Sequence, residues 1–279
     1  MLVSTDWLAS HLNDPILRIC DVRWYLLPPK TGPNEYARGH IPNAVFVNID
    51  GQLAEPPLQG PGRHPLPKPE RFAEAMSRAG IEADTHVVAY DDSGGSNAAR
   101  LWWLLRYYGH QAVSLLDGGI NKWIAEGRAL QIETPRVGRT HFVARVTDPD
   151  RVVNKNQVRA AQNDSRVLIL DSRVAERYEG RTEPIDPRAG HIPGAKNAPL
   201  AGNLNADFTF RSPEELHDRF AALGADGARQ IIAYCGSGVN ACATLFALAR
   251  GGFDNTLLYE GSWSDWSRDL NLAAETVTE

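Results

Sequence analysis

Cysteine and long apolar runs are scarce in this chain of 279 residues. The three cysteines, Cys20, Cys235 and Cys242, are too few and too unevenly spaced for a disulfide framework or a zinc site. No apolar stretch approaches the roughly 18 residues that span a bilayer. The first residues have neither the cationic start nor the apolar core of a secretion signal. We therefore expect free thiols, no membrane attachment and a cytoplasmic location.

Basic charge is not in excess either. The formal net charge is −5, with 29 Lys and Arg against 34 Asp and Glu, and no basic run occurs, which argues against a nucleic-acid partner. Hydrophobic residues make up 43% and charged residues 23% of the chain, as in ordinary globular proteins. The length accommodates two domains that each bury a core of their own.

A thiol stands at the hinge of a strand, a compact loop and a helix near the end of the chain. The apolar run Ile231–Tyr234 ends at Cys235, and a helical pattern begins at about Val239. Gly236 and Gly238 let the backbone bend sharply, so that N–H groups can turn towards the sulfur. Such an anion nest at a helix N-terminus favours thiolate over thiol and makes cysteine a nucleophile. The alternative is a small buried hydrophobic residue at a strand end.

Four segments of the first half return in the same order in the second half. A repeat of about 145 to 150 residues has the size of a domain, not of a solenoid unit. We therefore infer a duplication. The matched segments are 21–23 with 171–173, 39–44 (GHIPNA) with 190–195 (GHIPGA), 87–99 with 231–241, and 114–123 with 257–266.

The repeat predicts the domain organisation. We expect one domain over 1–127, a connector over 128–151 and a second domain over 152–279. Strands alternate with helices in each half, which predicts an α/β fold, in which each domain has a mostly parallel sheet flanked by helices on both faces. Ligands of such sheets bind beyond the carboxyl ends of the strands, where Cys235 lies.

Several local signals refine this organisation. Leu26–Pro33 and the proline-rich Glu55–Pro69 are predicted to be loops, the second a long irregular excursion on the surface. Ser212 and Glu215 predict a capping box, with Pro213 at the first helical position, for the helix before the cysteine strand.

The duplication also provides an internal control for the cysteine. Asp91 stands at the position of Cys235 in an otherwise similar strand, turn and helix. Because an aspartate cannot attack sulfur, the fold does not need a cysteine there, and the nucleophile interpretation of Cys235 gains support. We expect only the second half to be catalytic.

The tandem halves, the GHIPGA segment and the cysteine loop resemble the two-domain rhodanese superfamily over nearly the whole chain. The resemblance implies that Cys235 takes up a sulfane sulfur as a persulfide and passes it to an acceptor, whereas Asp91 marks the non-catalytic domain. The sequence Cys-Gly-Ser-Gly-Val is similar to that of the mercaptopyruvate sulfurtransferases. Asn240 departs from the threonine that is common in those enzymes.

The resemblance also implies substrate-binding residues. Arg177 and Arg188 resemble the family's substrate-binding arginines, which could hold a carboxylate through two parallel hydrogen bonds. The alternative for each is a surface ion pair. A loop without Lys or Arg suits mercaptopyruvate, whose carboxylate is remote from its sulfur, better than the doubly charged thiosulfate. The loop positions expected at the substrate are Gly236, Gly238, Val239 and Asn240.

Four other residues have open roles. Ser237 could donate its hydroxyl to the substrate or shuttle a proton, or could only suit the tight turn. His40 matches His191 in the repeat, which favours a structural role, although the resemblance leaves a contribution of His40 to the active site through the interface open. Cys242 is expected in the core and not as a resolving thiol, and Cys20 is expected to be buried.

The predicted function is sulfur transfer by double displacement. A small anionic sulfur donor, 3-mercaptopyruvate, would load Cys235, and a thioredoxin-like protein, a small thiol or cyanide would accept the sulfur, with no metal or organic cofactor. The alternatives are a thiosulfate sulfurtransferase and a non-catalytic sulfur carrier or redox-sensing module. A cysteine phosphatase is disfavoured because Ala241 stands where that class needs a phosphate-clamping arginine.

Overall fold

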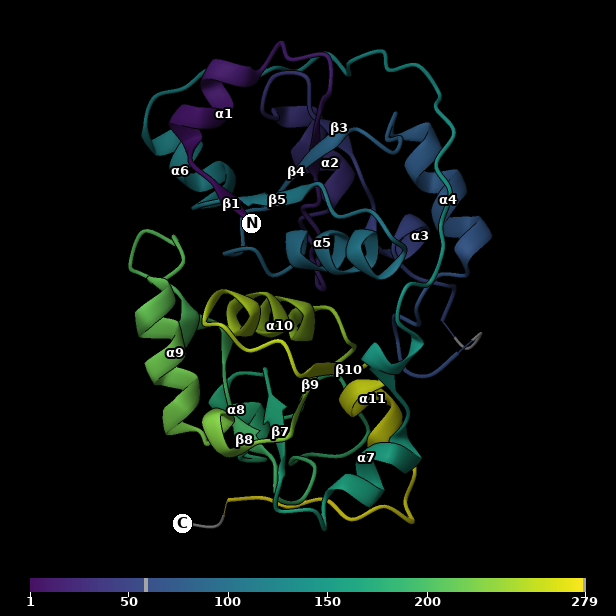
Figure 1. Cartoon of the computed structure of the whole chain (residues 1–279), viewed down its shortest axis with the longest axis vertical. Coiled ribbons are helices and arrows are strands. Elements are labelled where there is room, and N and C mark those ends of the chain that lie inside the picture. Colours follow the sequence, from purple (N-terminus) through teal and green to yellow (C-terminus); the bar gives the residue numbers. More distant parts are fainter. Residues whose placement is uncertain (58–59, 278–279) are drawn as a thin grey trace. The chain divides into compact units, whose positions relative to one another are not determined.

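The computed structural model describes residues 1–57 and 60–277, which form two compact units (Figure 1). Each unit includes a segment from the other half of the sequence, which the repeat does not predict. The predicted connector 128–151 is divided at residue 148. Unit 1 comprises Met1–Glu55, Pro67–Asp148 and Leu204–Phe210, and unit 2 comprises Pro56–Leu66, Pro149–Asn203 and Arg211–Glu279.

Unit 1 contains a five-stranded parallel sheet in the order β1-β5-β4-β2-β3. Its strands are β1 (Leu2–Val3), β2 (Leu17–Asp21), β3 (Val45–Phe46), β4 (His86–Tyr90) and β5 (Val113–Leu116). Its helices are α1 (Thr5–His11), α2 (Gly32–Arg38), α3 (Ile49–Gln52), α4 (Pro69–Arg78), α5 (Ala98–Tyr107) and α6 (Gly119–Ala125).

Unit 2 repeats this topology, with a five-stranded parallel sheet in the order β6-β10-β9-β7-β8. The predicted duplication and parallel sheets are thus confirmed. The strands are β6 (Val152–Val153), β7 (Val167–Asp171), β8 (Lys196–Asn197), β9 (Gln230–Tyr234) and β10 (Thr256–Tyr259). The helices are α7 (Lys155–Ala161), α8 (Ala175–Tyr178), α9 (Pro213–Ala222), α10 (Asn240–Arg250) and α11 (Ser262–Trp266), with 3₁₀ turns η1 (Pro149–Arg151), η2 (Leu200–Asn203) and η3 (Ala225–Gly227).

Each sheet is covered on both faces. In unit 1, Leu8 of α1 and Trp123 of α6 pack with Val88 of β4 in one core cluster, while α5 lies on the opposite side of the sheet (Figure 1). In unit 2, Val158 of α7 and Trp263 of α11 pack on one face, and α10 lies on the other (Figure 1). Because strand side chains alternate between faces, strands buried on both sides are nearly all apolar.

The capping box predicted before α9 is confirmed, whereas one predicted loop ends earlier than expected. The capping box of Ser212 and Glu215 at α9 is present. The loop predicted over Leu26–Pro33 is wrong at its end, because α2 already begins at Gly32. Thr31 caps this helix by accepting a hydrogen bond from the N–H of residue 34 at 3.3 Å, and a proline at the start of a helix costs no hydrogen bond.

A buried ion pair lies at the carboxyl end of β2 in unit 1 and of β7 in unit 2. Arg23 donates to Asp21 in unit 1, with Nη2 2.6 Å from Oδ2, and Arg173 donates to Asp171 in unit 2 at the same distance. All four side chains are nearly inaccessible to solvent. Removing one partner of such a pair typically costs about 3–5 kcal/mol, because the other charge stays buried. These pairs therefore stabilise the carboxyl ends of β2 and β7. In unit 2 this end of β7 is paired with the end of β9, which leads into the cysteine loop.

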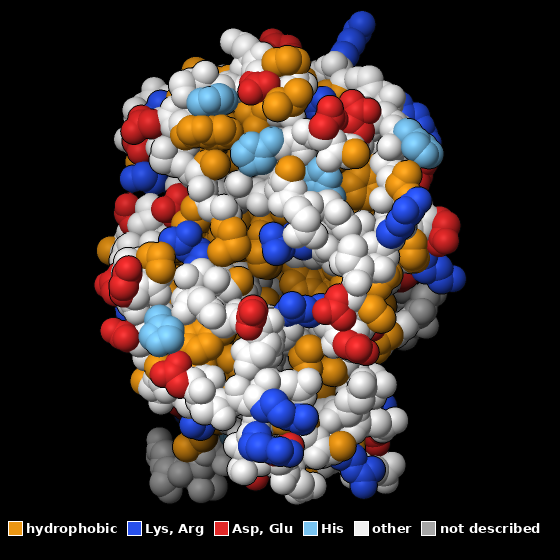
Figure 2. All heavy atoms as spheres, in the orientation of Figure 1, with side chains coloured by type: hydrophobic (Ala, Val, Ile, Leu, Met, Phe, Trp, Pro, Cys, Tyr) orange, Lys and Arg blue, Asp and Glu red, His pale blue; other side chains and the backbone are white. Residues whose placement is uncertain are grey.

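Charged side chains of both signs occur on one face of the molecule. Acidic and basic side chains are interspersed on the face in view in Figure 2. Among the described residues, the structure contains no helix with the length and apolar character needed to cross a bilayer.

Candidate active site

The cysteine loop joins β9 to α10 in unit 2, as the sequence predicts. Cys235 is 3% exposed, and the N–H of Gly238 donates to its Sγ at 3.1 Å. Gly238 has φ +82°, and a Cβ there would lie 2.5 Å from the carbonyl oxygen of Glu260. Only glycine combines this left-handed backbone with such a close approach, so Gly238 is required by the loop geometry.

The turn Glu260–Ser264, which follows β10, holds the loop from behind. The hydroxyl of Ser262 accepts from the N–H of Cys235 at 3.1 Å, and the N–H of Trp263 donates to the carbonyl of Cys235 at 2.9 Å. The N–H of Ser264 donates to the carbonyl of residue 236 at 2.9 Å. The backbone around the sulfur is therefore fixed by hydrogen bonds at consecutive residues.

The matching loop in unit 1 binds an anion of its own. The buried carboxylate of Asp91 accepts four backbone N–H groups at 2.7–2.9 Å, those of Ser93, Gly95, Asn97 and Ala98. Burial raises the pKa of this carboxyl, and the four N–H groups act in the opposite direction. A loop of this type thus gathers N–H groups around a negative charge, which supports the anion-nest interpretation of its partner in unit 2.

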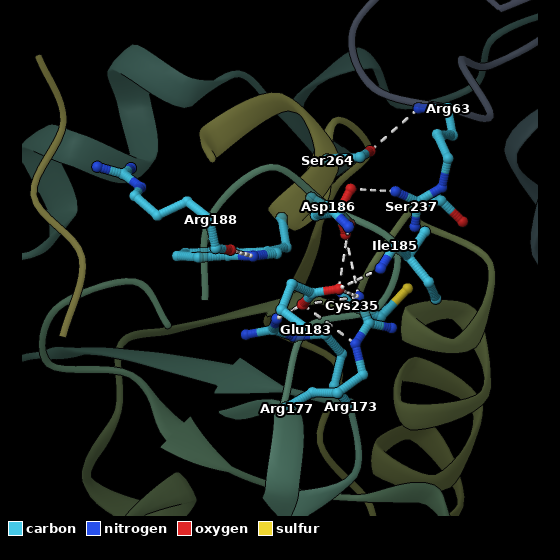
Figure 3. A network of polar contacts seen from close by, with 12 residues as sticks. Arg63, Arg173, Arg177, Glu183, Ile185, Asp186, Arg188, Cys235, Ser237 and Ser264 are labelled. Carbon is cyan, nitrogen blue, oxygen red and sulfur yellow. Dashed lines mark hydrogen bonds and ion pairs between the residues drawn. The ribbon is translucent and has the colours of Figure 1, made fainter. Parts of the chain in front are cut away.

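Arginines and carboxylates form a network beside Gly236 (Figure 3). Arg177 of α8 donates from Nη2 to both oxygens of Glu183, at 2.7 and 2.9 Å, and to Asp186 at 3.0 Å. A Cβ at Gly236 would lie 3.4 Å from Nη1 of Arg177. Arg177 therefore reaches the loop, and it does so from a largely buried set of ion pairs and not from a surface ion pair.

Sequence reasoning missed two residues of this site, Arg63 and His64. Glu55–Pro69 was expected to be a surface excursion, but Pro56–Leu66 belongs to unit 2, and His64 is 6% exposed. Residues 58 and 59 lie outside the described residues. An arginine and a histidine in the middle of a long proline-rich loop, with no counterpart in the repeat, were the available signal, since such loops often carry function.

His64 lies against the serine of the loop. Its Nδ1 is 2.8 Å from Oγ of Ser237, and both side chains are buried. Burial of a histidine and a hydroxyl at hydrogen-bond distance is a geometry that can move a proton. The predicted proton role of Ser237 thus acquires a partner that the sequence did not reveal.

Arg63 lies on the other side of the same loop. It forms an ion pair with Asp186 through Nη1, and its Nη2 would lie 2.9 Å from a Cβ at Gly236. Burial raises the pKa of Asp186, and the charges of Arg63 and Arg177 act against that shift. Two guanidinium groups therefore flank the first residue after the cysteine.

The structure places Arg188 apart from the cysteine loop, and substrate binding by this residue stays a prediction. Its Nη1 donates to the carbonyl of Leu272 at 2.7 Å, and its Nη2 lies 3.4 Å from the carbonyl of Trp266. In Figure 3 it points away from Cys235. The carbonyl groups after α11 have no helical partner, so they take up this guanidinium, and Arg188 secures the C-terminal segment.

The histidines of the GHIP segments occupy equivalent structural positions. His40 stacks on Tyr36 with ring centroids 3.9 Å apart, and its Nδ1 is 3.0 Å from the carbonyl of Tyr36. His191 stacks on Tyr178 at 3.8 Å, with a matching contact of 2.7 Å. Each ring therefore braces its own unit, as the symmetry of the repeat favours.

The same comparison aligns the charges of the two halves. Since Tyr36 matches Tyr178, Glu35 matches Arg177, and Asp92 takes the place of Gly236. Unit 1 thus has a glutamate in α2 where unit 2 has an arginine in α8, and an aspartate in its loop where the cysteine loop has a glycine. At these positions unit 1 has neither a thiol like that of Cys235 nor a positive charge like that of Arg177, which an anionic donor would need.

The other two thiols are buried, as expected. Cys20 lies within β2 and is 0% exposed, and Cys242 lies in α10 with Sγ 3.3 Å from the carbonyl of Gly238. The remaining predicted substrate positions, Val239 and Asn240, form the N-cap and first residue of α10. In the part of the chain that the structure describes, no group of three or more His, Cys, Asp or Glu side chains could hold a metal ion.

The fold and the site together define a class: a duplicated α/β protein in which one copy presents a thiol on an anion-binding loop. The family model of the rhodanese-like domain matches residues 4–126 and 154–269. The chain belongs to this family, with two rhodanese-like domains, and it is a sulfurtransferase. Because it is an enzyme, the interpretation as a non-catalytic carrier or sensor is set aside.

Individual relatives are similar over nearly the whole chain. A protein of Pseudomonas aeruginosa named probable 3-mercaptopyruvate sulfurtransferase is 41% identical, with 96% of this chain and 95% of the relative aligned. A Mycobacterium tuberculosis protein named putative thiosulfate sulfurtransferase SseB is 40% identical, with 96% and 94% aligned. The crystal structure of SseA from Escherichia coli, titled a 3-mercaptopyruvate sulfotransferase, has a TM-score of 0.83 at 36% identity and covers 94% of this chain and 98% of SseA.

Proposed function

We propose that this sulfurtransferase takes a sulfur atom from 3-mercaptopyruvate, holds it as a persulfide on Cys235, and passes it to a thiol or to cyanide. The observation that carries the proposal is the position of Arg177, which reaches Gly236 beside a cysteine whose Sγ already accepts the N–H of Gly238 at 3.1 Å. An arginine at this distance from the loop suits a donor whose carboxylate lies a few bonds from its sulfur.

In the first step the thiolate of Cys235 attacks the sulfur of mercaptopyruvate. The sulfur–carbon bond breaks, its electron pair stays on the carbon as the enolate of pyruvate, and the transferred sulfur is bound to Cys235 as a persulfide. The proton of the donor thiol must leave the sulfur, and the enolate must gain one at carbon. Ser237 and His64, 2.8 Å apart, form a short path for that proton.

In the second step an acceptor thiolate attacks the outer sulfur of the persulfide. The sulfur–sulfur bond breaks, the acceptor leaves as its own persulfide, and Cys235 returns as the thiolate. Cyanide would leave as thiocyanate by the same displacement. Neither step needs a metal or an organic cofactor, and a thioredoxin-like protein or a small thiol can serve as acceptor. We propose a cytoplasmic location, where such thiols are kept reduced.

Thiosulfate is the second candidate donor, because a relative at 40% identity carries the name putative thiosulfate sulfurtransferase. The deciding measurement is kcat/KM for mercaptopyruvate and for thiosulfate, side by side, with cyanide as acceptor. We expect a clear preference for mercaptopyruvate and no turnover by Cys235→Ser. A preference for thiosulfate would contradict the donor assignment, and an active Cys235→Ser protein would contradict the persulfide mechanism.

Arg177→Ala separates binding from folding. Loss of charge-assisted hydrogen bonds worth about 1.5–3 kcal/mol should lower kcat/KM by roughly 10- to 150-fold, while iodoacetamide still alkylates Cys235. Loss of both activity and alkylation would indicate a damaged fold.

A further inference from the structure

The segment Gly60–Leu66, here called the strap, is fixed to unit 2 on both sides of Arg63. The N–H of Arg63 donates to Oγ of Ser264 at 3.0 Å, and the N–H of Leu66 donates to Glu260 at 2.8 Å. Gly62 has φ +73°, and a Cβ there would overlap the carbonyl oxygen of residue 261. The strap therefore lies on the same Glu260–Ser264 turn that holds the cysteine loop, which sets Arg63 relative to that loop.

Two of the three guanidinium nitrogens of Arg63 have no hydrogen-bond partner among the described residues. Nη1 pairs with Asp186, but Nε is buried and has no hydrogen-bond partner among the described residues, and none of them pairs with Nη2. Nε and Nη2 form one edge of the guanidinium. Arg173 uses this same edge to hold Asp171, with Nε at 3.1 Å and Nη2 at 2.6 Å from its carboxylate.

The open edge is directed to the cysteine loop. Nη2 would lie 2.9 Å from a Cβ at Gly236, closer than either terminal nitrogen of Arg177, at 3.4 and 3.7 Å. Buried donors of a charged group are rarely left unsatisfied in native proteins. Nε is buried without a partner, and Nη2 lies beside the residue that follows the cysteine, so this edge can take up a group that is present only when the substrate is bound.

The network around this edge is electrically balanced before any substrate enters. Three arginines face three carboxylates in linked ion pairs. A singly charged donor would add one negative charge to this buried region, whereas thiosulfate would add two, at a greater electrostatic cost. The cations are Arg63, Arg173 and Arg177, and the anions are Asp171, Glu183 and Asp186.

We propose that Arg63 binds the anionic group of the sulfur donor through its Nε–Nη2 edge, and that the balanced network around it favours a donor with a single negative charge. This inference rests on the proposed function for the identity of the donor. The strap comes from the first half of the sequence, so the inference adds to the site of unit 2 a residue that the repeat does not predict.

Alkylation of Cys235 tests the proposal without any turnover. Iodoacetate carries a negative charge and iodoacetamide does not, so the ratio of their rates at Cys235, followed by peptide mass, reports the positive charge at the sulfur. We expect Arg63→Met to lower this ratio roughly tenfold, as for loss of a nearby unit charge, and Arg63→Lys to lower it less. Arg181→Met removes an exposed arginine that pairs with Glu179 in the same unit and should leave the ratio unchanged.

Asp186→Asn distinguishes binding from a purely structural role. Because it removes a negative charge next to Arg63, the ratio should rise, whereas structural damage would move the Arg63 and Asp186 variants in the same direction. Arg63→Met should also raise KM for mercaptopyruvate roughly tenfold and leave KM for its uncharged methyl ester within twofold, as expected for loss of one charged contact.

The proposal is overturned if a folded Arg63→Met protein keeps the wild-type alkylation ratio within twofold, or if a folded Arg63 variant loses as much with the methyl ester as with the acid. Arg63→Lys keeps a charge for Asp186 and serves if the methionine variant does not fold. Should the wild-type protein fail to use mercaptopyruvate, the proposed function fails, while the alkylation ratios still decide whether Arg63 binds anions at the sulfur.

Discussion

The three cysteines of this chain differ in what surrounds each sulfur atom. Cys20 lies inside a sheet, and burial raises its pKa from 9.0 to about 12. Cys242 is turned to a carbonyl oxygen, which favours the protonated thiol. Cys235 instead receives a backbone N–H and lies next to residues flanked by arginines. The same side chain is thus inert at two positions and suited to nucleophilic attack at the third.

Cys20 should make stability fall in alkali. Its folded-state pKa is raised, so the folded protein keeps the proton that the unfolded chain loses above about pH 9, and stability is lost as pH rises from about 9 towards 12. The slope attributable to this thiol should approach 1.4 kcal/mol per pH unit, about one proton. Urea unfolding at pH 8 and pH 10.5 should show a shallower decline for Cys20→Ala. Equal declines in the two proteins would contradict this assignment.

His64 should act on the rate and not on binding. Glutamine in its place keeps a hydrogen bond to Ser237 but cannot carry a proton, so kcat should fall roughly 10²- to 10³-fold with little change in KM, in the range of general acid–base catalysis. Alkylation of Cys235 by iodoacetamide should persist. A rise in KM without a fall in kcat would instead make His64 a positioning residue.

At the scale of the loop, Gly236 and Gly238 are required for different physical reasons. Gly238 needs a left-handed backbone and closely contacts a carbonyl oxygen, so Gly238→Ala should lose about 2 kcal/mol of stability or more. A Cβ at Gly236 would meet only the flexible ends of Arg63 and Arg177. Gly236→Ala should therefore fold normally and raise KM for the donor roughly tenfold, since it fills the space before the arginines.

Thermal unfolding and kinetics on the two variants check this contrast. Gly127→Ala is the matched control for strain alone, because Gly127 has φ +70° and nothing within 4 Å of its Cβ position. Equal stability losses for Gly236→Ala and Gly238→Ala would show that both positions serve the backbone only.

What the sequence predicts well at the element scale is local. The apolar run of β9, the glycines of the loop and the capping box of α9 each lie within a few residues, so their structures follow from neighbouring chemistry. The start of α2 was missed because the prolines before it obscured the cap at Thr31. The contacts of Arg188 could not be predicted, because the carbonyls of Trp266 and Leu272 lie about 80 residues further along the chain.

At the scale of the whole molecule, the duplication allows the half with the loop cysteine to be compared with a half that lacks it. The half without the loop cysteine has Glu35 and Asp92 at the positions of Arg177 and Gly236. Four matched segments predicted both sheets, and the strand, loop and helix around Cys235 located the thiol. Comparing the halves could not reveal Arg63 and His64, because the segment that crosses from the second half, Leu204–Phe210, contains neither an arginine nor a histidine. Long-range packing, and not local pattern, brings the strap to the site.

A thiol in the loop of unit 1 should not restore activity. Asp91→Cys in a Cys235→Ser background leaves Glu35 and Asp92 at the positions that correspond to Arg177 and Gly236 in unit 2, so an anionic donor is repelled. Sulfur transfer should stay at background with mercaptopyruvate and with thiosulfate. The single variant Asp91→Cys should keep its activity at Cys235, with lower stability from the four N–H groups that lose their carboxylate. Measurable turnover by the double variant would show that the loop alone suffices.

The exchange of segments, Pro56–Leu66 into unit 2 and Leu204–Phe210 into unit 1, bears on the history of such a chain. Deleting the first half of the chain would remove Arg63 and His64 from unit 2. The half without the loop cysteine therefore cannot be lost without changing the unit that carries Cys235. Neither half could then be shuffled alone into another protein as a working module. The two rhodanese-like domains would thus be inherited together, although only one of them carries the loop cysteine.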